Sequence, residues 1–498
     1  MLEAFLYGLV SVFQWPAFGL MLLGIAIGFA VGILPGLGGA VTLALMLPFT
    51  FTMQPVEAFA FLLGMLSVTA TTGDITSVLF GVPGEATTAA TILDGYPMTK
   101  RGEAGRALGA ALMSSLVGAV IGAFALAAVI PVVQPLVLSL GTPEFFMLAI
   151  VGITFVASLS SGAVRRGLIA GGLGLLLSFV GLDPQSGTQR FTFGLLYLWE
   201  GVSLIPVTIG LFAVPEIIEL AVKGTSIAER RVGEIGGVLQ GVKDTFRYWG
   251  VTVRCSLLGT FVGMIPGLGG SIAQWLAYAH AVQSSPDKSR FGQGDVRGVL
   301  GPGAANNSKE GGNLITTVAF GIPSTVVMAI LLGAFLIQGL VPGPDMLTKN
   351  LHITFSLVWI IVVTNIITVG VCFLFLNQLV KITYVRAHLL VPFLILLIFI
   401  GAFTTNNTHL DLLVMLAFGA LGYAMVTLGW PRPPLVLGLV LGKLAETYLY
   451  LSVGRYGWEW LFRPLVIVLL LIALAAVCYP TLAAWRGRKW DLSRLGGR

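Results

Sequence analysis

An eight-residue segment rich in proline and glycine occurs twice in this chain. Residues 32–39 read GILPGLGG and residues 263–270 read GMIPGLGG, each inside a long apolar stretch. Proline and glycine interrupt a helix, and the exposed backbone groups are costly in lipid unless they line a cavity or meet a ligand. Interruptions at matching positions of two halves are typical of transporter binding sites. The sequence therefore predicts a membrane carrier.

Composition agrees with a membrane protein. The chain is 56% hydrophobic and 10% charged, and its mean hydropathy is +0.94. The net charge of +6 does not indicate a nucleic-acid partner, because the cations lie in short loops and a basic tail. The three cysteines are scattered and the four histidines are dispersed, so we expect neither a metal site nor an enzyme.

The internal repeat extends beyond the first segment. Phe80-Gly81-Val82-Pro83 matches Phe320-Gly321-Ile322-Pro323, and residues 182–184 align with residues 429–431. We expect a first transmembrane repeat at 1–235, a cytoplasmic linker at 236–247, a second transmembrane repeat at 248–485 and a basic cytoplasmic tail at 486–498. The polar stretch 284–310 is expected to be an insertion in the second repeat.

Cation placement predicts the orientation. No Lys or Arg precedes Lys100, so the loop that begins there is placed in the cytoplasm, and the linker and tail follow it. Matching loops of the two halves carry opposite charge bias. Residues 381–388 contain Lys381 and Arg386 where 134–143 has no cation, and 403–410 has none where the first half has Arg165 and Arg166. This pattern predicts inverted-topology repeats.

Each Pro-Gly segment is predicted to turn between two half-length helices. A single helix over 248–283 would be about 54 Å long, against a hydrocarbon core of about 30 Å. A hairpin folded at 266–270 returns to its starting side and leaves Lys288, Arg290, Arg297 and Lys309 in the cytoplasm. The same holds for 17–53. The predicted fold is an all-α polytopic membrane protein with two inverted-topology repeats and broken or re-entrant helical hairpins at the Pro-Gly motifs.

A helix that begins after such a turn presents free N–H groups and the positive end of its dipole, which together bind an anion. The second helices are expected to begin near Ala40 and Ser271. Glycines at 36, 38, 39, 267, 269 and 270 allow a ligand to approach the backbone. The alternative interpretation is that these glycines only permit tight helix crossing.

A second pair of interruptions is unusually polar. Neutral hydroxyls and amides supply donors and oxygen ligands without permanent charge, which suits a carboxylate and Na⁺. A cation site is predicted at Thr71, Thr72, Asp74 and Asn313, with a loop position at the membrane surface as the alternative for Asp74. Lys309 is expected to face water rather than pair with Glu310. Glu85 and Asp94 are expected to be helix-start or surface carboxylates.

Several motifs together resemble the large membrane subunit of tripartite tricarboxylate transporters, the TctA-like family, over essentially the whole chain. They are both PGLGG segments, Val82-Pro83-Gly84, residues 93–97 (LDGYP), residues 190–194 (RFTFG), Ala304-Ala305-Asn306-Asn307 and residues 436–442 (VLGLVLG). One departure is Gly303, which stands where the family has an acidic residue, so the local charge of the site and the substrate stay open.

The resemblance implies partners and a function. The family works with a small four-helix membrane subunit and a periplasmic solute-binding protein in the bacterial inner membrane. It imports carboxylates such as citrate with an ion gradient, usually Na⁺, and needs no cofactor. Its ligand region falls here on Pro35, Gly36, Gly38, Gly39, Pro83, Gly84, Thr87, Thr88, Pro266, Gly267, Gly269, Gly270, Ser271, Asn306, Asn307, Pro323, Ser324 and Thr325. The alternatives are an anion channel and a stand-alone carboxylate permease.

Overall fold

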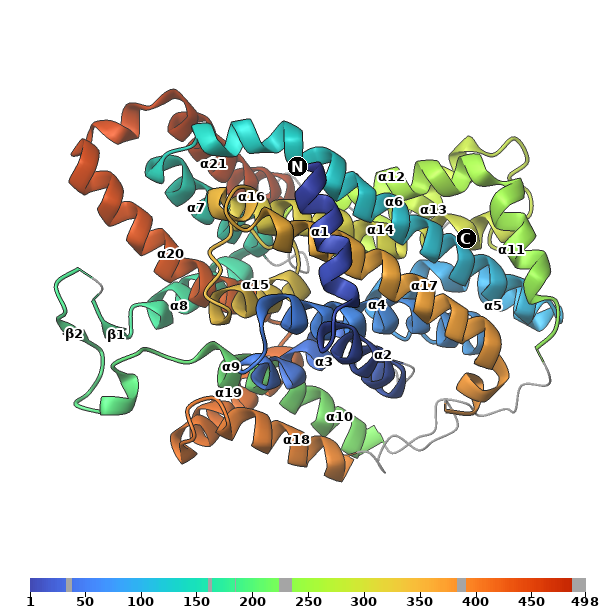
Figure 1. The fold of residues 1–498 in the computed structure, drawn as a ribbon, viewed down its shortest axis with the longest axis horizontal. Coiled ribbons are helices and arrows are strands. Elements are labelled where there is room, and N and C mark those ends of the chain that lie inside the picture. The colour runs from blue at the N-terminus through green and yellow to red at the C-terminus, as the bar shows by residue number, and fades with distance from the viewer. Residues whose placement is uncertain (33–37, 160–163, 184, 224–234, 383–390, 486–498) are drawn as a thin grey trace. The chain divides into compact units, whose positions relative to one another are not determined.

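A computed structural model describes residues 1–32, 38–159, 164–183, 185–223, 235–382 and 391–485 of the chain. Their regular structure is helical, apart from two short strands that form an antiparallel hairpin, β1 (Gly181–Leu182) and β2 (Gln189–Arg190). Figure 1 traces the helices along the chain. The all-α prediction is confirmed for this part of the protein.

Six helices in the described ranges are long and apolar enough to cross a membrane. They cover residues 55–80, 104–139, 204–222, 351–381, 409–427 and 433–456. A seventh span results if α1 (Leu2–Phe13) and α2 (Ala17–Gly32) count as one, although they are bent by 66° at the break between them. The length and composition of these helices indicate a multi-pass membrane protein.

The first of two compact units comprises residues 1–139 and 203–424. Its earlier segment holds α1, α2, α3 (Gly39–Met46), the 3₁₀-helix η1 (Leu47–Thr50), α4 (Pro55–Phe80), η2 (Ala86–Thr91), α5 (Ile92–Lys100) and α6 (Ala104–Ser139). Its later segment holds α9 (Leu204–Thr208), the π-helix η4 (Ile209–Ala213), α10 (Val214–Lys223), α11 (Val238–Arg247), α12 (Trp249–Gly263), α13 (Gly269–Ser284), α14 (Val296–Phe320), α15 (Val326–Ile337), α16 (Pro344–Leu347), α17 (Leu351–Ile382), α18 (Val391–Phe403) and α19 (His409–Thr427).

The second unit comprises residues 140–202 and 425–498. Its elements are α7 (Thr142–Leu159), α8 (Val164–Ser178), β1, β2, η3 (Leu196–Leu198), α20 (Pro433–Tyr456), η6 (Glu459–Phe462) and α21 (Pro464–Trp485). Arg190 joins its two segments, since its guanidinium donates to both carboxylate oxygens of Glu446 at 2.6 and 3.1 Å. Each unit combines segments from both halves of the chain. The units therefore reflect contacts in space and do not correspond to the two predicted repeats. The repeat boundaries at 235 and 248 stay a prediction.

The matching FGVP and FGIP segments end two helices in the same way. α4 ends at Gly81 (φ 69°, ψ 20°), and α14 ends at Gly321 (φ 69°, ψ 19°). This left-handed conformation favours glycine at the end of a helix. Pro83 and Pro323 follow two residues later, where proline cannot continue the helix.

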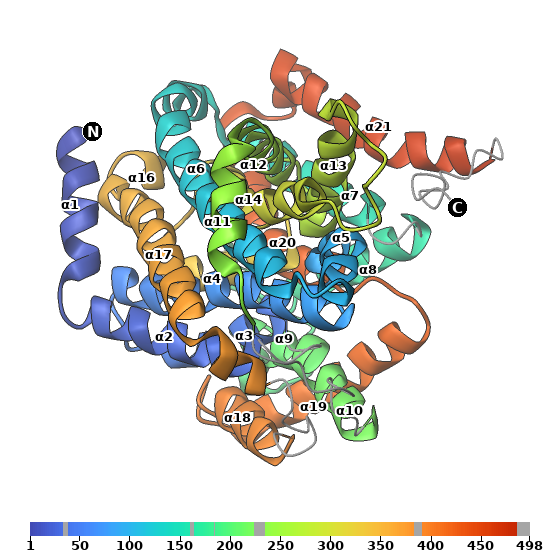
Figure 2. The same cartoon turned by 90° about the vertical axis from the view of Figure 1, so that its right-hand side faces the viewer.

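α14 is the most deeply placed helix of the first unit and packs against α6, α12 and α13 (Figure 2). Glycine permits the α6 crossing, because a Cβ atom at Gly311 would lie 2.0 Å from the carbonyl oxygen of Gly122. The polar stretch 284–310 therefore continues into a buried helix from residue 296, and its being an insertion in the second repeat stays a prediction. Lys309 lies inside this helix and is 4% exposed.

The second Pro-Gly segment separates two helices that pack against each other. α12 ends at Gly263 and α13 begins at Gly269. Cys255 of α12 donates its thiol hydrogen to the carbonyl oxygen of Ala277 of α13 at 3.5 Å, and Val251 and Ala281 join the same apolar cluster. This pairing makes an antiparallel hairpin, so the predicted interruption of 248–283 is confirmed. At the first segment, α2 ends at Gly32 and α3 begins at Gly39.

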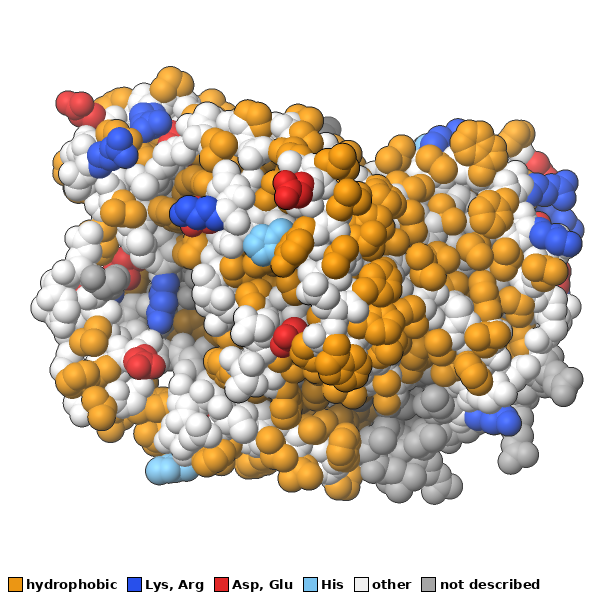
Figure 3. Space-filling model, viewed as in Figure 1, with side chains coloured by type: hydrophobic (Ala, Val, Ile, Leu, Met, Phe, Trp, Pro, Cys, Tyr) orange, Lys and Arg blue, Asp and Glu red, His pale blue; other side chains and the backbone are white. Residues whose placement is uncertain are grey.

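Apolar side chains cover much of the first unit's surface over α1, α6 and α17 (Figure 3). Leu6 and Phe13 of α1, Phe124 of α6, and Ile366 and Leu374 of α17 are all exposed large apolar residues. Polar side chains are instead buried inside α4 and α14. This inside-out distribution is expected where lipid replaces water and polar groups must find partners within the protein.

Candidate functional site

Polar side chains of α4 and α14 face each other within the first unit. The Asn306 amide donates to the carbonyl oxygen of Ala70 at 2.7 Å and to Oδ2 of Asp74 at 3.3 Å. The Asn307 amide donates to Oγ1 of Thr71 at 2.8 Å. Asp74 is buried within a helix, so the alternative that it lies in a surface loop is wrong.

A third helix, α17, contributes to this polar seam. The Asn307 amide also donates to Oδ1 of Asn365 at 2.6 Å, and Asn365 is 1% exposed. Asn365 was not among the predicted site residues; it is the one amide in the largely apolar run IIVVTNIITV at residues 360–369. An isolated amide in such a run is the signal that could have identified it, because an amide at membrane depth requires a partner.

Two oxygens of the seam accept no hydrogen bond of ordinary geometry in the described part of the protein, although the Thr91 hydroxyl lies close to the Asp74 carboxylate. They are Oδ1 of Asp74 and Oδ1 of Asn307, and both side chains are buried. An unsatisfied buried polar atom is costly, and a carboxylate or amide oxygen is a natural ligand for a hard cation. The donor set around Asp74 therefore fits a small cation such as Na⁺.

The structure does not bring the predicted cation residues into one group. Thr71 and Asp74 lie in the seam described above. The Thr72 hydroxyl donates to the carbonyl oxygen of Val68 at 2.8 Å, next to Gly32. Asn313 lies farther along α14, where its amide donates to Glu310 at 3.1 Å. The structure therefore has two candidate cation-binding regions, one at Asp74 and one at Asn313, where a single one was expected.

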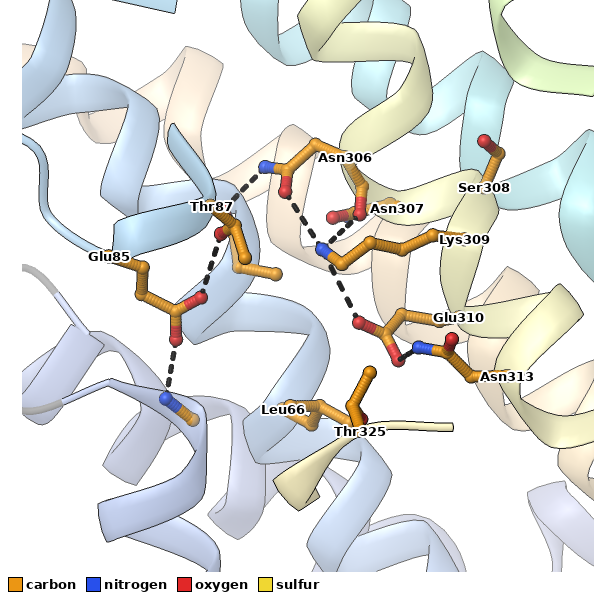
Figure 4. Close-up of polar contacts among 12 residues, drawn as sticks. Leu66, Glu85, Thr87, Asn306, Asn307, Ser308, Lys309, Glu310, Asn313 and Thr325 are labelled. Atoms are coloured by element: carbon orange, nitrogen blue, oxygen red, sulfur yellow. Dashed lines mark hydrogen bonds and ion pairs between the residues drawn. The ribbon is translucent and has the colours of Figure 1, made fainter. Parts of the chain in front are cut away.

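Lys309 and Glu310 form a buried ion pair on α14 (Figure 4). The Lys309 ammonium lies 3.5 Å from Oε1 of Glu310 and donates to the carbonyl oxygen of Asn306 at 2.6 Å and to its Oδ1 at 3.1 Å. Glu310 is 8% exposed. The expectation that Lys309 faces water is wrong, because the helix buries it and its partners come from the same turn.

The start of α3 is already in contact with a carboxylate of the protein. The backbone N–H of Gly39 donates to Oε1 of Glu85, and the Thr87 hydroxyl donates to Oε2 of Glu85 at 3.1 Å (Figure 4). Glu85 also caps η2, as the expectation of a helix-start carboxylate anticipated. An anion therefore lies where the helix dipole favours one, and it belongs to the chain itself.

The start of α13 has a different neighbour. A Cβ atom at Gly270 would lie 2.4 Å from Cε of Lys309 and 2.7 Å from Cγ2 of Thr87. The turn before it is anchored by the N–H of Gly267, which donates to the carbonyl oxygen of Ser324 at 2.9 Å. Gly270 and Thr87, two of the predicted ligand residues, thus lie beside Lys309, and their role in binding stays a prediction.

Several other predicted ligand residues pack against the backbone or form hydrogen bonds with backbone groups. Gly84 packs against Gly73, where an added Cβ would lie 2.5 Å from Cα. The Thr88 hydroxyl donates to the carbonyl oxygen of Glu85 at 3.0 Å, and Thr325 Oγ1 accepts from the N–H of Met328 at 3.2 Å. Pro83 is exposed, Pro323 is buried, and Pro266 and Gly38 are half-buried. Pro35, Gly36 and the side chain of Ser271 lie outside the described residues.

Asp94 links α5 to the segment before α14 through hydrogen bonds. Its Oδ1 accepts from the N–H groups of Gly294 and Asp295 at 2.7 and 2.8 Å, and its Oδ2 accepts from the Tyr278 hydroxyl at 3.0 Å. Asp94 lies in the first turn of α5, so the helix-start alternative is confirmed, and the surface alternative is wrong because the residue is fully buried. Burial raises the pKa of this carboxyl above its ordinary value, against the lowering effect of these donors. Asp94 is a structural anchor.

Comparison with known proteins identifies relatives of the chain. Residues 18–437 match the model of the TctA family of tripartite tricarboxylate transporters. The chain is 32% identical over 470 residues to an uncharacterized 52.8 kDa protein in the TAR-I ttuC' 3' region of Agrobacterium vitis, covering 94% of this chain and 93% of that protein. It is also 32% identical over 191 residues to an uncharacterized protein in the TAR-II ttuC' 3' region, covering 38% and 79%. No solved structure matches the chain.

Proposed function

Since the chain belongs to the TctA family and is the transmembrane subunit of a tripartite tricarboxylate transport system, we propose that it is the large permease subunit of a binding-protein-dependent uptake system driven by a Na⁺ gradient. The proposed substrate is citrate or another di- or tricarboxylate. The proposed partners are a small four-helix membrane subunit and a periplasmic solute-binding protein. We place the permease in the bacterial inner membrane with its C-terminus in the cytoplasm.

The observation that carries this proposal is the buried polar seam between α4 and α14, adjoining the start of α13. A polar interior in a protein with an apolar exterior has a high cost in lipid unless it binds what it transports. The start of α13 offers N–H groups for a carboxylate at Gly269 and Gly270. Thr87 lies beside Gly270 with its methyl group, and its hydroxyl donates to Glu85.

The coupling ion is proposed to bind in the seam. Asp74 supplies a carboxylate and Asn307 an amide oxygen, each with an oxygen that accepts no hydrogen bond of ordinary geometry from the described residues. Thr71 lies beside them through its hydrogen bond to Asn307. Oxygen ligands of this kind suit Na⁺ because they replace part of its hydration shell without fixing a large charge in the membrane.

Two inverted repeats remain part of the proposal. The equal terminations of α4 and α14 at Gly81 and Gly321 support a common ancestry of the two halves. The opposite cation bias of matching loops supports their inversion. The hairpin of α12 and α13 is then a re-entrant element of the second repeat, and α2 with α3 its counterpart. Transport would move the hairpins against the remaining helices.

The deciding experiment is uptake of labelled citrate into proteoliposomes that contain this chain and its small subunit. The cognate binding protein and an inward Na⁺ gradient are each added or omitted. Uptake that needs both supports the proposal, whereas uptake without the binding protein favours a stand-alone permease. Flux that does not saturate and persists without the Na⁺ gradient favours an anion channel. Failure of citrate with success of another carboxylate corrects only the substrate.

A further inference from the structure

We propose that the Lys309–Glu310 ion pair couples substrate to cation: a substrate carboxylate replaces Glu310 as the partner of Lys309, and the released Glu310 carboxylate then binds a second Na⁺, distinct from the ion proposed at Asp74. This inference rests on the proposed function, because it assumes that a carboxylate enters at the start of α13. It assigns a role to two charged residues that the predicted ligand region left out.

The geometry allows the exchange. The Lys309 side chain packs against the backbone of Gly270, since a Cβ atom added to Gly270 would lie only 2.4 Å from Cε of Lys309. A carboxylate held by the first N–H groups of α13 therefore lies within reach of the ammonium group. The ion pair is long at 3.5 Å, whereas the same ammonium makes its short contact, at 2.6 Å, with a backbone carbonyl oxygen. Glu310 is thus the partner that a ligand most readily replaces.

Replacing Glu310 by a substrate carboxylate leaves the Glu310 charge uncompensated, so the exchange requires a cation. Lys309 is 4% exposed and Glu310 is 8% exposed, so water screens neither charge well. Removing one member of a buried pair leaves the other charge uncompensated, which is strongly unfavourable. Asp74 and Glu85 are further carboxylates near this group and cannot supply the missing positive charge. A carboxylate that takes Lys309 therefore leaves Glu310 in need of a cation.

Neutral amide and hydroxyl groups beside Glu310 suit Na⁺ better than a proton. The Asn313 amide nitrogen donates to Oε2 of Glu310 at 3.1 Å, and its Oδ1 accepts from the Ser324 hydroxyl at 2.8 Å, so the amide must turn over to offer its oxygen to a cation. Thr325 lies on the Glu310 side of the group in Figure 4. Amide and hydroxyl oxygens complete the coordination of a metal cation, but a proton needs none of them. Ser324 also holds the turn before α13, which joins the cation position to the substrate position.

The first test needs no substrate. In Lys309→Gln, Glu310 is left without its partner, as it would be in the loaded carrier. Na⁺, exchanged for choline at constant ionic strength and pH, should raise the melting temperature of this variant by about 3 °C or more beyond its effect on the wild type. The double variant Lys309→Gln/Glu310→Gln should lose that excess. Lys349→Gln, which breaks a surface pair with Asp345, is the matched control and should show none.

The second test uses labelled citrate and Glu310→Gln, so it stands if Lys309→Gln does not fold. In the wild type, Na⁺ should raise citrate affinity by about 5- to 150-fold, the usual range for coupled sites. In Glu310→Gln, Lys309 is already free, so the Na⁺ dependence of citrate affinity should fall at least about threefold below that of the wild type, and the remainder is assigned to the ion at Asp74.

Distinct outcomes separate the inference from the proposed function. Equal Na⁺ effects on Lys309→Gln and on the double variant would overturn the inference, as would stabilisation of Lys309→Gln by acid instead of Na⁺. Unchanged Na⁺ dependence of citrate binding in Glu310→Gln would do the same. A wild type that binds no carboxylate would instead overturn the proposed function, while the melting measurements would still judge the ion pair.

Discussion

At the residue scale, the candidate site depends on side chains that have little room to move. Gly270 separates Lys309 from Thr87, and a single added methyl group would contact both. Asp74 is enclosed on all sides and retains one oxygen that accepts no hydrogen bond of ordinary geometry in the described structure. Small chemical changes at these positions should therefore alter binding without changing how the chain inserts into the membrane.

Gly270→Val should abolish carboxylate uptake. The valine side chain would displace Lys309 and fill the space at the start of α13, so neither could contact a ligand. Gly370→Val is the control, since a Cβ at that glycine of α17 has no neighbour within 4 Å. Uptake in proteoliposomes, normalised to folded protein, is the measurement. Wild-type uptake by folded Gly270→Val would contradict the proposed substrate position.

Asp74→Asn should weaken Na⁺ activation of uptake. The substitution keeps the shape but removes the charge of the proposed ligand, so half-activation should need about tenfold more Na⁺, or about 1.4 kcal/mol. The exposed Asp287 provides the control as Asp287→Asn. The Na⁺ concentration for half-maximal uptake is the quantity to compare. If both variants respond like the wild type, Na⁺ does not bind at Asp74.

The sequence predicted some of these residues and not others, for a physical reason. Gly81, Pro83, Gly321 and Pro323 act through local backbone rules that a sequence displays directly. Lys309 does not, because a polar run with Asn, Ser, Lys and Glu is typical of an exposed segment. Its burial depends on partners such as Ala70, which contacts Asn306 across 236 residues of chain. Periodicity does not report such contacts.

At the element scale, glycine sets how closely α6 and α14 approach. The carbonyl oxygen of Gly122 faces Gly311 directly, so the two helices have no space for a methyl group between them. Without a hydrophobic driving force between helices in lipid, close van der Waals packing is what holds them together. This crossing fixes the position of α14 and hence of its buried polar residues.

Gly311→Ala should destabilise the protein by about 1–3 kcal/mol, because overpacking forces the helices apart. Gly370→Ala, with open space around it, should have little effect. The apparent melting temperature in detergent distinguishes the two, and equal values would contradict the crossing described here.

Half of this architecture was predictable from the sequence. The turn at 264–268 was expected, whereas the helix over 296–320 was not, because its low hydropathy resembles that of an exposed segment.

Asp94→Ala should loosen the attachment of α5. The two N–H groups of Gly294 and Asp295 would lose their charged acceptor inside the protein, which costs about 2–4 kcal/mol in total. Hydrogen exchange at residues 294–298 should accelerate in the variant. Asp183→Ala, at a half-buried loop carboxylate that makes no contact with residues 294–298, is the matched control. Unchanged exchange at residues 294–298 would mean that Asp94 is not an anchor.

At the scale of the whole molecule, orientation follows from loop charge. Single cysteines at Lys288 and Thr404 test it in a Cys478→Ser background, because Cys255 and Cys372 are buried. The positive-inside rule and the proposed inversion place Lys288 in the cytoplasm and Thr404 outside. A membrane-impermeant maleimide added to intact cells should label Thr404→Cys and spare Lys288→Cys. Labelling of both from one side would refute the inverted arrangement.

The two helix starts also differ in a way that their sequences conceal. Aligning FGVP with FGIP sets Glu85 opposite Thr325, so one start has an acidic companion and the other a neutral one. Near the neutral one stands Lys309. The two helix starts therefore differ in charge, since one lies beside a carboxylate and the other beside an ammonium group. A substrate with two identical ends would therefore bind with each end beside different protein groups, so its two ends would no longer be equivalent.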